Sequence, residues 1–116
     1  LMAKFRIERV EQLILEELSA LILREEIKDP RVTSMALVRE VKVSNDLRHA
    51  TVRISGYLSE EELDGAVEGL NHGAGFIQSR LGKRIKLRST PRLRFIADHS
   101  IEEGFKVTET IRNLES

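Results

Sequence analysis

The chain has no cysteine, no tryptophan and only five other aromatic side chains among its 116 residues. The absence of cysteine excludes a disulfide framework, a thiolate metal site and a cysteine nucleophile, and nothing requires an oxidising compartment. No run of apolar residues approaches the ~20 that a membrane span needs, and the first residues lack the apolar stretch of a secretory signal. We therefore expect a cytoplasmic protein without membrane contact, folded as one domain over residues 1–116 with its core at about 4–99.

Charge is unevenly distributed along the chain, although 19 basic and 19 acidic side chains give a formal net charge of zero. Residues 72–97 carry seven basic side chains and no acidic one, namely Arg80, Lys83, Arg84, Lys86, Arg88, Arg92 and Arg94. Such a segment favours phosphate binding. An isolated basic run is more often the solvated face of a helix and a strand, so both interpretations stay open until the fold is considered.

Two patterns divide the first half of the chain into a helix and two strands. Between Lys4 and about Ile27 apolar residues recur at steps of three and four, which predicts a helix with one buried stripe, although Glu11 falls inside that stripe. From 32 to 57 apolar and polar residues alternate, which predicts two strands. Ser44-Asn45-Asp46 is a turn signal, so the strands should form an antiparallel hairpin.

A second helix is predicted to begin after Ser59, because Ser59 and Glu62 form a capping box. Gly73-Ala74-Gly75 then interrupts the helical spacing, which resumes towards Leu81. The pattern therefore predicts two helices across a kink.

The last part of the chain predicts a third strand and a short tail. Beyond Gly82 basic and apolar residues alternate with extended-chain spacing, and Pro91 breaks this pattern. Ser100 and Glu103 form another capping box, which predicts a short helix in residues 100–116.

These elements together describe an α+β fold, in which helices pack on one face of a three-stranded sheet. Their order is that of a type II KH-like domain. KH domains bind single-stranded nucleic acid at a junction between two helices, commonly through a Gly-x-x-Gly loop. No Gly-x-x-Gly occurs in the chain, and Gly73-Ala74-Gly75 takes the interhelical position.

Four segments resemble the ribosome-binding factor A family, in which an Ala-x-Gly kink replaces the usual loop. They are Arg6-Ile7-Glu8-Arg9-Val10, Lys28-Asp29-Pro30-Arg31, Val43-Ser44-Asn45-Asp46-Leu47 with Ala50, and Gly75-Phe76-Ile77 through Pro91, Leu93, Phe95 and Asp98 to Ser100-Ile101-Glu102-Glu103-Gly104. The resemblance covers most of the chain. Gly73 departs from it, because the family usually has alanine there, and glycine would loosen the kink.

The resemblance implies a monomeric factor, without a cofactor, that binds the immature 30S subunit and contacts 16S ribosomal RNA. It also implies a role in late maturation of the 5′ end of that RNA, importance in the cold, and assembly GTPases as further partners. The alternative is a protein-docking module that binds a ribosomal protein or an assembly GTPase. Salt dependence would discriminate, because RNA binding weakens steeply with salt.

Within such a fold the basic segment and the Gly73-Ala74-Gly75 kink become the main candidates for RNA binding. Arg6 and Arg9 would extend this surface if their end of the first helix lay beside the kink, and otherwise serve solubility. Lys28 and Arg31 would either position RNA or pair with nearby acids. With so few aromatic residues, most of them expected in the core, recognition of RNA backbone and shape is favoured over base readout.

The sequence offers little for catalysis. The three histidines, His49, His72 and His99, are isolated and lack metal-ligand spacing such as His-Glu-x-x-His. No Gly-Lys-Ser/Thr follows the kink, so it is not a P-loop. We therefore expect neither catalytic activity nor a metal site.

Overall fold

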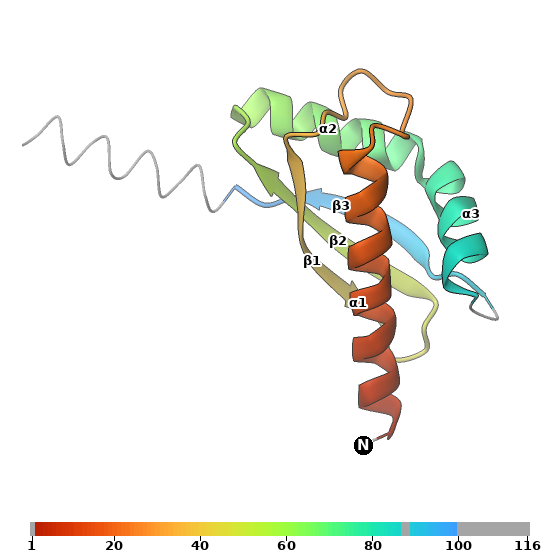
Figure 1. Cartoon of the computed structure of the whole chain (residues 1–116). Helices are drawn as coiled ribbons and strands as arrows, with labels where there is room; N and C mark the ends of the chain where they lie inside the picture. The colour runs from red at the N-terminus through yellow and green to blue at the C-terminus, as the bar shows by residue number, and fades with distance from the viewer. Residues whose placement is uncertain (1, 87–88, 100–116) are drawn as a thin grey trace, which may run out of the picture.

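The structure, a computed structural model, describes residues 2–86 and 89–99. Its elements are α1 (Met2–Leu23), β1 (Ala36–Val43), β2 (His49–Gly56), α2 (Glu60–His72), α3 (Ala74–Ile85) and β3 (Arg92–Ala97), shown in Figure 1. The predicted order of elements is confirmed. The helix predicted in residues 100–116 and the predicted site residue Arg88 lie outside the described residues.

The sheet is mixed, with the strand order β1-β2-β3. β1 and β2 are antiparallel, as the hairpin pattern predicted, whereas β3 runs parallel to β2. In the central register Val52 of β2 lies between Val41 of β1 and Phe95 of β3. All three side chains are buried, so the centre of the sheet belongs to the core.

The hairpin turn is held together by the side chains of Ser44 and Asp46. The Asp46 carboxylate accepts hydrogen bonds from the Ser44 hydroxyl at 2.6 Å and from the Arg48 N–H at 3.0 Å. These two bonds lower the pKa of Asp46, the Ser44 hydroxyl contributing most. Ser44 Oγ also accepts from the His49 N–H at 3.0 Å, which closes the turn. The predicted turn is thus confirmed.

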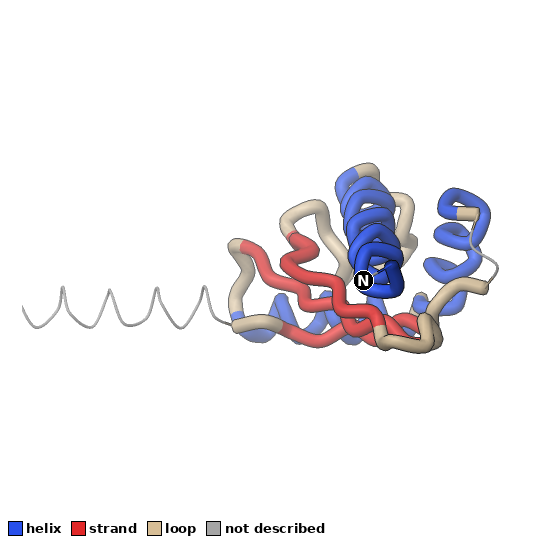
Figure 2. Tube along the Cα trace, turned by 90° about the horizontal axis from the view of Figure 1, so that it is seen from below, coloured by secondary structure: helices blue, strands red, loops and turns tan. Residues whose placement is uncertain are grey.

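The helices pack against one face of the sheet. Buried Leu18 of α1, Leu70 of α2 and Ile77 of α3 belong to one hydrophobic cluster with the inward-facing strand residues. Figure 2 shows α1 crossing the strands on one side, with α3 beside it. No described helix packs on the other face of the sheet. Strand side chains alternate between the two faces, so exposed Arg92 and Arg94 of β3 point to this other face.

α1 ends at Leu23, four residues before the end predicted at Ile27. The cause is Glu25, whose left-handed backbone (φ 55°) turns the chain out of the helix. The Glu25 N–H donates to the carbonyl of Ile22 and the Glu26 N–H to that of Leu21, both at 3.0 Å. This is the Schellman pattern, which glycine usually makes, and so the sequence carried little sign of it.

The capping box that begins α2 is confirmed. The Glu62 N–H donates to Ser59 Oγ at 3.1 Å, and the Ser59 N–H donates to Glu62 Oε1 at 3.0 Å. Three glutamates in the first turn also complement the helix dipole.

The prediction that the chain becomes extended directly beyond Gly82 is wrong, because α3 continues to Ile85. Leu81 and Ile85 are four residues apart and both pack on the core, so the helical spacing persists there. Lys86 then adopts a left-handed conformation (φ 55°) that ends the helix. The third strand begins at Arg92, after the predicted break at Pro91.

Candidate nucleic-acid interface

The junction between α2 and α3 is made by Gly73, which belongs to neither helix. Its N–H donates to the Gly69 carbonyl and its own carbonyl accepts from the Ile77 N–H, both at 3.0 Å. Gly73 supplies no side-chain cap to α3. The predicted kink at Gly73-Ala74-Gly75 is therefore confirmed as a boundary between two helices, and the first-turn amides of α3 receive no side-chain acceptor from their N-cap.

A hollow of about 200 Å³ opens beside this junction. The chain that follows α1 forms one wall, and residues from the end of α2 to the start of α3 form the other. Its lining comprises Ile27, Lys28, Asp29, Gly69, His72, Gly73 and Phe76. Lys28 is exposed and forms no ion pair with any described residue, so it places a cation at the rim of the hollow.

It is the C-terminal end of α1 that adjoins the junction, whereas Arg6 and Arg9 lie near its N-terminal end. Arg6 is roughly 25 Å from Leu23 at 1.5 Å per helical residue. Figure 1 shows the N-terminus at the end of α1 remote from α2. The condition under which Arg6 and Arg9 would extend the junction surface is thus not met.

Arg31 is held in an ion pair beside the same hollow. Its Nη2 lies 2.8 Å from Asp29 Oδ2, and its Nε and backbone N–H both donate to Asp29 Oδ1, at 3.0 and 2.9 Å. These bonds, the side-chain bonds foremost, lower the pKa of Asp29 to about 2 and raise that of Arg31. Arg31 Nη1 also lies 3.5 Å from Glu68 of α2. The pairing that the sequence left open for Arg31 is therefore formed, and its charge is largely compensated.

Glycine at position 69 allows α2 to pack closely on this loop. A Cβ built there would lie 3.0 Å from the Asp29 carboxylate and 3.0 Å from a Val32 methyl group. The Asp29–Arg31 pair consequently sits directly against α2, one turn before the junction.

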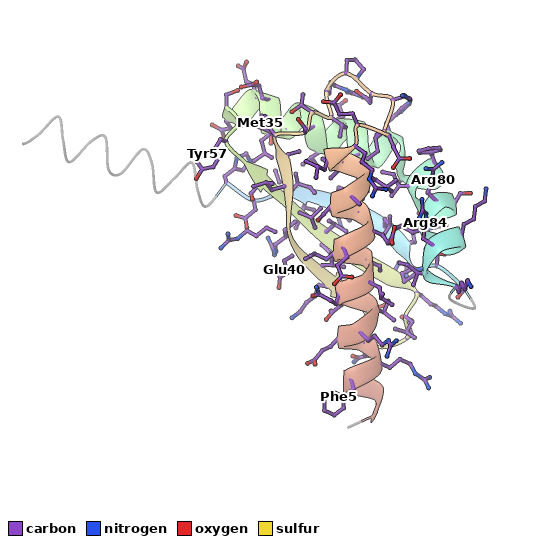
Figure 3. All side chains as sticks on the ribbon, in the orientation of Figure 1. Phe5, Met35, Glu40, Tyr57, Arg80 and Arg84 are labelled. Atoms are coloured by element: carbon purple, nitrogen blue, oxygen red, sulfur yellow. The ribbon has the colours of Figure 1, made fainter. Side chains whose placement is uncertain are left out.

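Three of the predicted cations lie on α3 and a fourth is its C-cap, but they are not equivalent. Arg80 Nη2 lies 2.5 Å from Glu26 Oε1, and its guanidinium carbon is 5.8 Å from the centre of the Phe76 ring. Lys83 and Arg84 are exposed and form no ion pair with the part of the chain that is described. Figure 3 shows Arg80 and Arg84 on α3, one turn apart. Lys86 follows as the C-cap, so the helix ends with uncompensated positive charge.

The predicted basic segment does not form one surface. Arg92 and Arg94 alternate with buried Leu93 and Phe95, so they point to the open face of the sheet, whereas α3 belongs to the helical layer on the other face. The structure thus groups Lys83, Arg84 and Lys86 at the C-terminal end of α3, roughly 15 Å along the helix from Gly73, and separates Arg92 and Arg94 from them.

Phe76 is a candidate that the sequence analysis missed. Its side chain is 48% exposed, lines the hollow and carries Arg80 over its ring. Phe5 and Tyr57 are also exposed, so the expectation that most aromatic residues are buried is wrong for the described chain, where only Phe95 is. The sequence did contain a signal for this exposure. Phe76 directly precedes the core residue Ile77, and adjacent residues of a helix point about 100° apart, so Phe76 cannot share the core-facing side. An exposed ring beside a cation is able to stack on a nucleobase.

No group of three or more potential metal ligands occurs among residues 2–86 and 89–99. The same part of the chain contains no helix long and apolar enough to cross a membrane.

The fold and this surface define a class: a KH-like α+β protein with a cationic helix beside an interhelical kink. The family model of ribosome-binding factor A matches residues 6–111. The chain belongs to the ribosome-binding factor A family.

Individual relatives agree with this assignment. Ribosome-binding factor A of Caldanaerobacter subterraneus subsp. tengcongensis is 44% identical over 111 residues, which cover 96% of this chain and 90% of the relative. The crystal structure of ribosome-binding factor A from Thermus thermophilus superposes with a TM-score of 0.61 at 25% identity, covering 84% of this chain and 96% of that one. A homology model of the Thermus thermophilus factor, fitted into the cryo-EM map of a 30S–RbfA complex, shares the fold with a TM-score of 0.57 at 24% identity; it covers 75% of this chain and 93% of that one.

Proposed function

We propose that this protein binds the immature 30S subunit in the cytoplasm by contacting 16S ribosomal RNA, and that it assists late maturation of that RNA, including its 5′ end. Family membership supports the ribosomal target, and the Thermus factor has been fitted into a map of a 30S complex. The observation that carries the proposal is a set of cations without acidic partners among the described residues: Lys28 at the rim of the hollow beside the α2–α3 junction, and Lys83 and Arg84 at the C-terminal end of α3.

The junction and α3 suit RNA because together they offer two kinds of contact. The cations attract phosphates, and binding releases the counterions of the RNA. Phe76 offers a ring on which an unstacked base can lie. The chain acts without chemistry of its own: it stabilises the RNA conformation to which it binds better and so shifts the population towards it. Misfolded RNA helices are escaped more slowly in the cold, which gives a physical reason for a role at low temperature.

The test is sedimentation of the purified protein with 30S subunits, 50S subunits and 70S ribosomes across a salt series. Wild type should co-sediment selectively with 30S subunits, and its affinity should fall with a log–log slope of about −0.7 per phosphate contact to a single strand. Lys83→Glu/Arg84→Glu should weaken binding by at least about tenfold, because two attractions become repulsions. Lys86 is left unchanged, because its left-handed backbone ends α3, and a substitution there would change the helix end as well as the charge.

The matched control is Arg6→Glu/Arg9→Glu, which alters the net charge equally at the remote end of α1. Binding that survives in the control but is lost in the α3 variant supports the proposal. Equal losses would show that only net charge matters, and undiminished binding of the α3 variant would refute the assigned surface.

A protein partner, such as an assembly GTPase, is a second candidate because three large apolar side chains are exposed near one end of the β1–β2 pair. Met35 and Leu37 are about half exposed and Tyr57 is 81% exposed, and the register places Ala36 opposite Gly56. Apolar side chains grouped on a surface are typical of protein interfaces. Binding to an isolated GTPase that persists after ribonuclease treatment, and is lost in Leu37→Ser/Tyr57→Ser, would support this function.

A further inference from the structure

The open face of the sheet carries cations that the α3 surface does not include. Arg92 and Arg94 are exposed on β3, and the register places His49 opposite Arg92 and Thr51 opposite Arg94. Lys42 of β1 lies opposite Thr51 on its other side. Since neighbouring strands are about 4.8 Å apart and alternate residues of one strand about 6.8 Å apart, these side chains cover a compact area.

Acidic side chains on this face are already paired, although Glu40 is the outward-facing neighbour of Lys42 on β1. Glu40 Oε2 lies 3.3 Å from Arg53 Nε. These two residues form the outward-facing pair next to Lys42 and Thr51 in the β1–β2 register. Asp98, beyond the end of β3, lies 3.2 Å from Arg39. Lys42, Arg92 and Arg94, by contrast, form no ion pair with any described residue. The face is therefore divided into a neutral half and a cationic half.

The backbone that carries Arg92 and Arg94 is held in place by a hydrogen bond and by core packing. The Arg92 N–H donates to the Arg48 carbonyl at 2.8 Å, which ties the start of β3 to the hairpin turn. Leu93 and Phe95, between and beside the two arginines, are buried in the core. Arg92 and Arg94 thus project from a rigid strand, so little backbone entropy is lost when they bind a ligand.

We propose that Lys42, Arg92 and Arg94, with the Thr51 hydroxyl between them, form a second RNA-binding surface that holds the phosphates of another strand segment. This sheet surface faces away from the helical layer that carries Lys83 and Arg84. One molecule therefore binds two RNA segments at once and holds them together. The inference rests on the proposed function, because it takes α3 and the junction as the first RNA surface.

The experiment uses two non-complementary single-stranded RNAs of about 12 nucleotides, within the range of single-strand site sizes. One carries a donor fluorophore and the other an acceptor. Wild type should form a complex of one protein with two RNAs in native mass spectrometry and should give energy transfer. Lys42→Glu/Arg94→Glu should bind one RNA without energy transfer, and Lys83→Glu/Arg84→Glu should do the same through the other surface.

Two further variants make the result interpretable. Lys42→Gln/Arg94→Gln removes charge without repulsion and should reduce the salt slope by about 1.4, the value for two lost contacts. Arg6→Glu/Arg9→Glu should retain the two-RNA complex. Thermal unfolding followed by circular dichroism shows that each variant is folded.

A wild-type complex that takes only one RNA, or energy transfer that persists in the sheet variants, would overturn the inference. These results are distinct from failure of the proposed function. Wild type that sediments with 30S subunits but binds one RNA overturns the second surface alone, whereas wild type that binds neither RNA nor subunits overturns the proposed function itself.

Discussion

The carboxylate of Glu11 on α1 accepts a hydrogen bond from the backbone N–H of Val43, with 2.8 Å between Glu11 Oε2 and the nitrogen. Val43 is the last residue of β1, which is an edge strand of the sheet. A backbone N–H that points outward from an edge strand has no partner in another strand. Leaving such a group unpaired costs free energy when it is partly buried. Glu11, the acid that interrupts the apolar stripe of α1, is explained by this contact.

Replacing Glu11 with alanine should lower the free energy of unfolding by about 1–3 kcal/mol, the usual cost of losing a hydrogen bond to a charged group. Glu11→Gln should lose less, because the amide oxygen still accepts from Val43. Urea unfolding measures both. Glu8→Ala, a change at an exposed position one turn earlier, is the control; equal stability of Glu11→Ala and Glu8→Ala would contradict the role given to Glu11.

The opposite edge of the sheet is covered by an amide side chain. Asn71 Nδ2 donates to the Phe95 carbonyl and Asn71 Oδ1 accepts from the Phe95 N–H, both at 2.9 Å. Gln78 of α3 accepts from the Leu93 N–H at 3.3 Å. Helix side chains therefore take the place that a fourth strand would occupy beside β3.

Asn71→Ala should destabilise the protein by about 1–3 kcal/mol, since two backbone groups lose their partners. It should also increase association at high protein concentration, because an uncovered edge can pair with another chain. Asn71→Asp keeps the acceptor but loses the donor, so its stability should be intermediate. Urea unfolding measures the stability and light scattering measures the association. An alanine variant that is as stable as wild type and associates no more than wild type would show that Asn71 is not needed to protect the edge of β3.

Local patterns were sufficient to predict the order of elements, the hairpin and the capping box at Ser59, because each depends on residues close together in the chain. Helix ends were less predictable. Glu25 and Lys86 end α1 and α3 in left-handed conformations that non-glycine residues rarely adopt, and nothing in the spacing of apolar residues announces them. The edge contacts of Glu11 and Asn71 depend on tertiary packing and were invisible for that reason.

The candidate site was predicted in composition but not in arrangement. Arg80 and Arg94 belong to one basic segment, yet Arg80 pairs with Glu26, 54 residues away, and Arg94 lies on the other side of the sheet. A charge count along the chain cannot anticipate either outcome, because pairing and facing depend on how the elements pack. Lys42 was missed because residues 1–71 carry 14 acidic and 10 basic side chains, so the charge count pointed only to the later segment.

Asp29 should make stability depend on pH in acid. Its pKa in the folded protein, about 2, lies below the ordinary value of 3.8, so the folded state favours the ionised carboxylate. The stabilisation is therefore fully present above about pH 4 and is lost as the pH falls towards 2. The difference in unfolding free energy between wild type and Asp29→Asn should be constant from about pH 7 to pH 5 and should shrink below pH 4. A difference that stays constant down to about pH 3 would show that the carboxylate charge is not involved.

Gly73→Ala should stabilise the protein by about 0.4–1 kcal/mol, because alanine reduces the conformational freedom of the unfolded chain. The position does not need glycine: its φ of −92° is open to other residues, and a Cβ would meet only the Gly69 and Leu70 carbonyl oxygens, at 3.6 and 4.0 Å. Gly75→Ala, with no atom within 4 Å of the added Cβ, is the matched comparison. Urea unfolding gives the stability and sedimentation with 30S subunits gives the affinity. A stabilised Gly73→Ala that still binds shows that RNA recognition uses the kink as it stands, whereas a stabilised variant that binds weakly would mean that the junction must flex to admit RNA.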